Sequence, residues 1–216
     1  SQCHLTPKVC IAAILNQMEN LRYIFTRIKN NMTNFFLILC FFSMGFCQSL
    51  VPNDSVNIYK DSIVEDFSAI DKKGNAVSFV NDILSEECTI VLVFFRGFWW
   101  PHCRKQLVEL SKLNLPRKVK IYAISNENYS KSKSLQKQLY RKNSINFLED
   151  NSGDVFDYFG IIDSRYSDSK REGIPYASTY VINKNRKVTY AYIALDYKER
   201  PSNKIIMNEI MKALNE

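Results

Sequence analysis

The chain has 216 residues, of which 46% are hydrophobic and 24% are charged. This composition is ordinary for a globular protein and excludes collagen-like, low-complexity and wholly disordered chains. The formal net charge is +7, but residues 48–216 hold only 25 basic against 21 acidic side chains, an excess too small to predict a nucleic-acid partner.

An uncharged apolar run, FFLILCFFSMGFC, extends from Phe35 to Cys47. It is shorter than the ~20 residues of a membrane-spanning helix, but it has the length of the apolar part of a secretory signal. Gly45 and Cys47 take the −3 and −1 positions if cleavage precedes Gln48. We therefore predict that residues 1–47 are an N-terminal extension and signal peptide, and that the mature protein is exported (periplasmic or secreted) with no stable membrane anchor. The alternatives are a buried helix and a lipoprotein signal that lipidates Cys47.

Removal of residues 1–47 leaves Cys88 and Cys103 of the six cysteines. A predicted strand separates the two, and at ~3.3 Å per residue it places them more than ~20 Å apart, too far for a disulfide. The chain has only two histidines, His4 and His102, and no CxxC pair, which excludes a zinc cluster. Nothing in the sequence resembles a phosphate-binding glycine loop, so we expect no metal and no organic cofactor.

Residues 48–60 are predicted to be an irregular lead-in to one compact domain, residues 61–216. The first predicted elements in chain order are strands at 66–70 and 76–80 around the turn DKKGN, then a short helix at 80–85. The unbroken apolar run from Thr89 to Phe95 is typical of a strand buried on both faces. A helix is expected from Pro101, since proline is tolerated in a first turn, with Leu107, Leu110 and Leu113 as its buried stripe.

The rest of the chain continues the alternation of strands and helices. The predicted elements are a strand at 119–124, a polar helix at 131–142, a strand at 145–148, a short helix at 155–159 ended by Gly160, a polar loop at 161–174, a hairpin of strands at 178–182 and 188–193, and an amphipathic helix at 205–214. This order predicts an α/β fold with a central mixed sheet and helices on both faces.

Two separate stretches carry a resemblance to a known family. VLVFFRGFWWPHCRKQLVEL, residues 91–110, is similar to the pattern F-x-R-G-x-W-C-P-x-C-x-x-Q-L of the alkyl hydroperoxide reductase/thiol-specific antioxidant (peroxiredoxin-like) family. Further on, IPYASTYVINKNRKVTYAYIALDYKER resembles the family segment P-x-P-A-T-x-x-I-D followed by D-Y-x-x-R. The resemblance covers residues 61–216 and implies a thioredoxin-like three-layer sandwich.

The redox turn departs from the family pattern at one position. A thiol at the N-terminus of a helix faces unpaired N–H groups and the positive end of the helix dipole, both of which favour the thiolate. In the sequence WPHC, Trp100 stands at the position of the family's nucleophilic cysteine, and only Cys103, one turn deeper, keeps its sulfur. Indole cannot attack a peroxide or a disulfide. A UGA codon read as tryptophan would hide a selenocysteine. Whether residue 100 is encoded as tryptophan or as selenocysteine therefore stays open.

The resemblance implies further site residues. Arg96 and Arg200 match family positions and either stabilise a thiolate or peroxide oxygen or form structural salt bridges. Cys103 is either a lone redox thiol influenced by His102 and Arg104 or a helical thiol that acts as a small hydrophobe. The other predicted site-lining residues are Trp99, Trp100, Pro101, Pro175 and Ala177. Ala177 occupies the cis-proline position of thioredoxins and is expected to be trans.

These residues support two functions of different classes. The first is an exported thiol-based oxidoreductase that uses Cys103 for peroxide reduction or thiol exchange, with catalysis impaired by Trp100. Its partners would be a peroxide or a protein thiol or disulfide, and an external thiol to reset the sulfenic acid. The second is a non-catalytic thioredoxin-fold binding protein. The family also makes a homodimer an expected assembly.

Overall fold

The computed structural model describes residues 56–84, 88–128, 139 and 145–216, all of which belong to the compact unit Leu50–Glu216. The predicted signal peptide, residues 1–47, and most of the predicted helix at 131–142 therefore lie outside the described residues. Leu139 is helical and buried. Among the residues described, no helix has both the length and the apolar character needed to cross a membrane.

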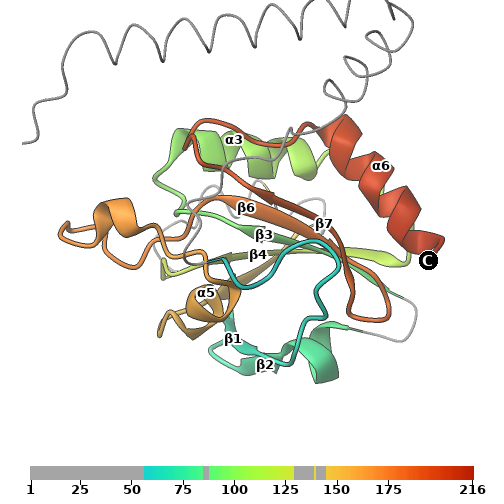
Figure 1. Cartoon of the computed structure of the whole chain (residues 1–216), viewed down its shortest axis with the longest axis horizontal. Helices are drawn as coiled ribbons and strands as arrows, with labels where there is room; N and C mark the ends of the chain where they lie inside the picture. The colour runs from blue at the N-terminus through green and yellow to red at the C-terminus, as the bar shows by residue number, and fades with distance from the viewer. Residues whose placement is uncertain (1–55, 85–87, 129–138, 140–144) are drawn as a thin grey trace, which may run out of the picture. The chain divides into compact units, whose positions relative to one another are not determined.

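A seven-stranded mixed sheet forms the centre of this unit (Figure 1). Its strands follow the order β2-β1-β5-β4-β3-β6-β7. β3 pairs in parallel with β4 and antiparallel with β6, so it lies inside the sheet. The strands are β1 (Ser68–Asp71), β2 (Ala76–Ser78), β3 (Thr89–Phe94), β4 (Val119–Ser125), β5 (Asn146–Glu149), β6 (Ser178–Ile182) and β7 (Val188–Ile193).

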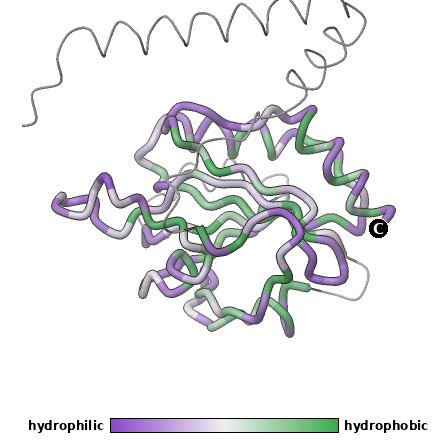
Figure 2. The backbone as a smooth tube through the Cα atoms, viewed as in Figure 1, coloured by the Kyte–Doolittle hydropathy of each residue, from purple (hydrophilic) through white to green (hydrophobic). Residues whose placement is uncertain are grey.

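The buried strand β3 supplies two hydrophobic cores, one on each face of the sheet. Ile90, Leu92 and Phe94 belong to one core, and the alternate residues Val91 and Val93 belong to the other. This alternation follows from the strand geometry, in which successive side chains point to opposite faces. In Figure 2, hydrophobic residues follow the strands of the sheet, and hydrophilic segments lie toward the outside.

Helices cover both faces of the sheet (Figure 1). The helices α3 (Pro101–Leu110) and α6 (Asn203–Leu214) bury Leu107 and Ile206 in one core, while α5 (Asp154–Phe159) and the helical turn η1 (Phe79–Ile83) pack into the other. A further turn, η3 (Ser164–Tyr166), lies in the loop before β6. The structure thus has the three layers that the sequence predicts.

Most predicted elements are confirmed, with differences at their ends. α6 begins two residues earlier than its apolar pattern indicates, because the Ser202 hydroxyl caps it by accepting a hydrogen bond from Ile205 N–H at 3.3 Å. β2 ends at Ser78, where the side chain caps η1. The prediction of a plain polar loop at 161–174 is wrong in part: Ile161, Asp163 and Ile174 are buried.

Candidate functional site

The site is built where β3 ends and the chain turns into α3. The register pairs Phe94 of β3 with Ser178 of β6 and with Ile124 of β4, so the residues beyond these positions meet at one edge. Gly97 makes the turn with a φ of 133°, and an added Cβ would lie 2.4 Å from the Trp99 side chain. This close approach requires glycine at the position.

Cys103 is the third residue of α3 and is fully buried. Its sulfur accepts a hydrogen bond from Arg200, with 3.2 Å between Nη2 and Sγ. Arg200 belongs to the segment between β7 and α6, 97 residues further along the chain. The structure therefore brings together two of the residues that the resemblance singled out, and it places a guanidinium donor directly on the sulfur.

A buried glutamine holds Arg200 in this position. Gln106 lies one turn below Cys103 on α3, and its Oε1 accepts a hydrogen bond from Arg200 Nε at 2.9 Å. Its Nε2 donates to Thr179 Oγ1 of β6 at 3.2 Å. The amide thus ties the guanidinium to both the helix and the sheet, and Arg200 Nη1 also donates to the carbonyl of Tyr197 at 3.0 Å.

Trp100 is the N-cap residue of α3, directly before Pro101, which occupies the first helical position. Its side chain makes no capping hydrogen bond. The Trp100 ring packs edge-on against Tyr197 with 5.3 Å between centroids, and the His102 ring lies 6.2 Å away. Trp99 is more exposed, at 39% of its surface. The mouth of the predicted redox turn is therefore filled by aromatic rings.

The Arg96 guanidinium packs against the Trp100 ring, and the residue is 1% exposed. Its guanidinium carbon is 5.1 Å from the centre of the Trp100 ring and 4.5 Å from that of Tyr166. The Asp163 carboxylate is 3.7 Å from Nη2. Within the described part of the chain, the guanidinium nitrogens of Arg96 and the indole nitrogen of Trp100 have no hydrogen-bond acceptor. Arg96 thus forms a structural salt bridge, which is one of its two predicted roles. The distance between Nη2 and the carboxylate oxygen is too long for a hydrogen bond.

The Asp163 carboxylate forms ion pairs with two arginines, Arg96 and Arg165. Arg165 donates to both carboxylate oxygens, each at 2.7 Å, and this hydrogen bonding raises the pKa of Arg165 above its ordinary value. One carboxylate thus faces two guanidinium groups, of which Arg96 also lies against the Trp100 ring.

Pro175 and Ala177 lie at the same edge of the sheet, and both are already paired with other residues of the chain. Both are buried, and Pro175 forms an isolated bridge with Ile162. The Ala177 carbonyl accepts a hydrogen bond from Ala194 N–H at 2.9 Å. The described residues contain no cis peptide bond, so Ala177 is trans as expected. The Ala177 carbonyl is therefore already paired within the chain.

Several residues of the site were not singled out from the sequence. Gln106 stands in the quoted family pattern, so the pattern itself held the signal. Asp163 and Thr179 carried none, because polar residues in a loop or a strand are common. Tyr197 stands in the quoted D-Y-x-x-R segment, and its ring contacts Trp100. No three His, Cys, Asp or Glu side chains gather as a metal site among the residues described.

A family model described as the AhpC/TSA family matches residues 61–191. The chain belongs to the AhpC/TSA family. No curated protein sequence matches it. Similar solved structures include a peroxiredoxin-like protein from Aquifex aeolicus, with 13% identity, a TM-score of 0.58 and coverage of 74% of this chain and 91% of that one.

Two other structures show the same fold. AhpC from Enterococcus faecalis has 15% identity and a TM-score of 0.59, and the match covers 72% of this chain and 92% of that one. A yeast mitochondrial 1-Cys peroxiredoxin, described as resolved via glutathione/thioredoxin systems, has 17% identity and a TM-score of 0.57, with coverage of 74% and 77%. These likenesses confirm the predicted thioredoxin-like α/β fold of this AhpC/TSA member.

The buried Arg96–Asp163 pair yields a stability prediction. Asp163→Asn leaves the Arg96 charge buried without a carboxylate, and breaking a buried pair in this way lowers the free energy of unfolding by about 3–5 kcal/mol. Asp168→Asn removes the same charge from an exposed position of the same loop and is expected to change it by less than ~0.5 kcal/mol. Urea denaturation measures both, and equal effects would contradict the prediction.

Proposed function

We propose that this AhpC/TSA member is a thiol-dependent oxidoreductase in which Cys103 alone carries the redox chemistry. The observation that supports the proposal is the contact between Arg200 Nη2 and Cys103 Sγ at 3.2 Å. A guanidinium held by Gln106 is fixed before any reaction begins, so it can stabilise a thiolate without reorganisation. Thiolate is the form of cysteine that attacks.

The proposed reaction consumes a peroxide and is completed by an external thiol. The Cys103 thiolate attacks one oxygen of the peroxide, the O–O bond breaks, and the other oxygen leaves with a proton as an alcohol or water. The resulting sulfenic acid condenses with a thiol to give a mixed disulfide and water. A second thiol then attacks this disulfide, releasing the reduced Cys103 and a disulfide of the two external thiols.

The reductant is proposed by chemical class. With Trp100 beside it, Cys103 has no second cysteine one turn away on α3, so the resolving thiol must come from another molecule. The similar yeast 1-Cys peroxiredoxin, which is resolved via glutathione/thioredoxin systems, supports a small or protein thiol in this role. A homodimer remains part of the proposal, because the family resemblance suggests it.

We further propose that this activity is impaired. Cys103 is fully buried, and the rings of Trp100 and Tyr197 pack over the same turn. A peroxide therefore reaches the sulfur only when side chains around Cys103 move. The full burial of Cys103 is also the observation that favours the second candidate function, a non-catalytic binding protein with the same fold.

The export of the protein is also a proposal. It is supported by the apolar run from Phe35 to Cys47 and by the basic residues Arg22, Arg27 and Lys29 before it. Cleavage before Gln48 would release the AhpC/TSA domain into the periplasm or the medium.

Cys103→Ser tests the redox role. With excess dithiothreitol, wild-type protein is expected to consume hydrogen peroxide, and Cys103→Ser is expected to lose at least about tenfold in rate, because serine cannot form a sulfenic acid. Cys88→Ser removes the other buried cysteine of the domain and should keep the wild-type rate. Equal rates for wild type and Cys103→Ser would support the non-catalytic alternative instead.

Trp100→Cys tests the proposed cause of the impairment. The new thiol would lie at the N-cap of α3, next to the Arg96 guanidinium and one turn from Cys103. We expect a gain of at least about tenfold in peroxide consumption, together with loss of two titratable thiols on oxidation. Trp99→Cys places a thiol one residue away, outside the helix, and should give no such gain. Unchanged activity of Trp100→Cys would show that residue 100 does not limit catalysis.

Expression of the full chain in a host with a secretory pathway tests export. The exported protein is expected to begin at Gln48 when its N-terminus is sequenced. Leu37→Arg/Leu39→Arg interrupts the apolar run and should leave the chain unprocessed and inside the cell. A mature protein that retains residues before Gln48 would rule out this cleavage site.

A further inference from the structure

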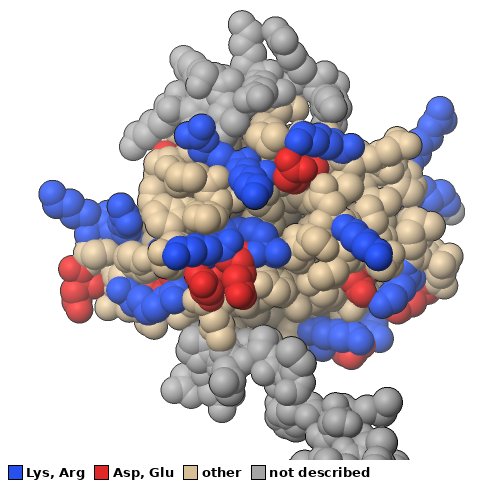
Figure 3. All heavy atoms as spheres, turned by 90° about the horizontal axis from the view of Figure 1, so that it is seen from above, with Lys and Arg blue, Asp and Glu red and all other residues tan. Residues whose placement is uncertain are grey.

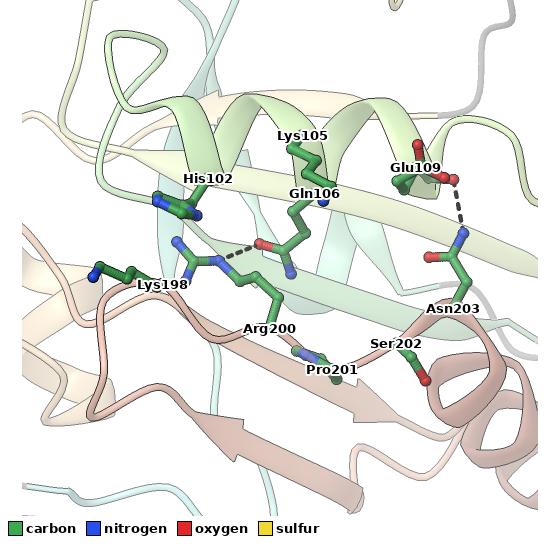
Figure 4. Close-up of a pocket in the computed structure, with 9 residues that line it drawn as sticks. All are labelled: His102, Lys105, Gln106, Glu109, Lys198, Arg200, Pro201, Ser202 and Asn203. Carbon is green, nitrogen blue, oxygen red and sulfur yellow. Dashed lines mark hydrogen bonds between the residues drawn. The ribbon is translucent and has the colours of Figure 1, made fainter.

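A pocket of about 440 Å³ lies between α3 and the segment that leads into α6. Figure 4 shows side chains of α3, among them Lys105 and Gln106, on one side and Lys198 and Arg200 on the other. Its volume is in the range of pockets that hold small molecules, ~300–1,000 Å³. It does not include Cys103 among its lining residues, so it is a separate feature beside the redox turn.

The pocket is lined by more positive than negative charge. Lys105, Lys198 and Arg200 supply three cations, and Glu109 supplies the one carboxylate. Glu109 is already paired, since Lys112 Nζ lies 2.6 Å from its Oε1. Seen from the side of α3 and α6, Lys and Arg side chains lie near the middle of this face, with Asp and Glu side chains among them (Figure 3).

None of the three cations has a carboxylate partner among the described residues. Lys105 and Lys198 make no ion pair there; the Lys198 Nζ lies 5.3 Å from the centroid of the Tyr197 ring, and the Lys198 backbone N–H donates to Asp196 Oδ1 at 2.9 Å. The acidic neighbour Glu199 does not line the pocket; its carboxylate accepts a hydrogen bond from Tyr192 at 3.4 Å. Among the described residues, the three cations that line the pocket therefore have no carboxylate at ion-pair distance.

Arg200 keeps a donor for a ligand. A guanidinium has five N–H groups, and Arg200 uses four of them, on Gln106 Oε1, the carbonyls of Tyr197 and Glu199, and Cys103 Sγ. The acceptors are a neutral amide, two neutral carbonyls and sulfur. One Nη2 hydrogen remains, on a group whose position is fixed by the other four bonds.

We propose that this pocket binds a small organic polyanion that bears carboxylate or phosphate groups. Such a group accepts the remaining hydrogen bond of Arg200 and neutralises Lys105 and Lys198, and charge-assisted hydrogen bonds of this kind are the strong ones. The polar, charged lining favours an anion over an apolar ligand. The site goes beyond the proposed redox function, because it requires neither sulfur chemistry nor a peroxide.

Calorimetric titration of the full chain with citrate and with pyrophosphate, at constant ionic strength, tests the site. We expect saturable binding of at least one probe, and which probe binds distinguishes a carboxylate ligand from a phosphate ligand. Lys105→Gln/Lys198→Gln is expected to weaken binding by about tenfold. Both lysines are exposed, so the variant should fold. Lys73→Gln/Lys170→Gln removes the same charge from exposed positions outside the pocket and should bind like wild type.

The titration also separates this proposal from the redox proposal. It measures the heat of binding in the absence of peroxide and reductant, so a protein without peroxide-reducing activity is still expected to bind the probe. Absence of binding by wild type to both probes would overturn the inference. So would equal weakening in the Lys105→Gln/Lys198→Gln and Lys73→Gln/Lys170→Gln variants, since the effect would then come from net charge alone.

Discussion

The burial of β3 on both faces is the constraint on which the rest of the structure depends. Its alternate residues enter two separate cores, one on each face of the sheet, and the strand pairs with β4 along one side and with β6 along the other. Once β4 and β6 pair with it, their ends are fixed at one edge. The turn from Arg96 to Trp100 emerges at that edge, and α3 can only pack back over the sheet. The position of Cys103 is therefore a consequence of the core.

Arg200 connects the parts of the molecule that carry chemistry. It reaches α3 from the segment before α6, donates to Cys103 Sγ and is fixed by Gln106, which in turn contacts Thr179 of the sheet. The same guanidinium lines the cationic pocket beside the redox turn. Any anion bound in that pocket would lie next to the group that contacts the thiol, so ligand binding and the chemistry of Cys103 share one side chain.

The buried charge of Arg96 distinguishes the redox turn from an ordinary aromatic cluster. A guanidinium with its nitrogens out of contact with water normally has full hydrogen bonding, yet Arg96 has only a distant carboxylate and two aromatic rings as partners among the described residues. Such an environment suits an anionic group better than it suits indole.

The sequence by itself determined the order of elements, the buried strand and the helix from Pro101, because apolar periodicity and proline chemistry act locally. It also determined the family, through residues close together in two short stretches. Only the tertiary structure decided which side chains meet. The Cys103–Arg200 contact joins residues 97 positions apart, and Asp163 reaches Arg96 from a loop with no distinctive pattern. The cationic pocket likewise depends on how α3 packs against the segment before α6, which no local pattern records.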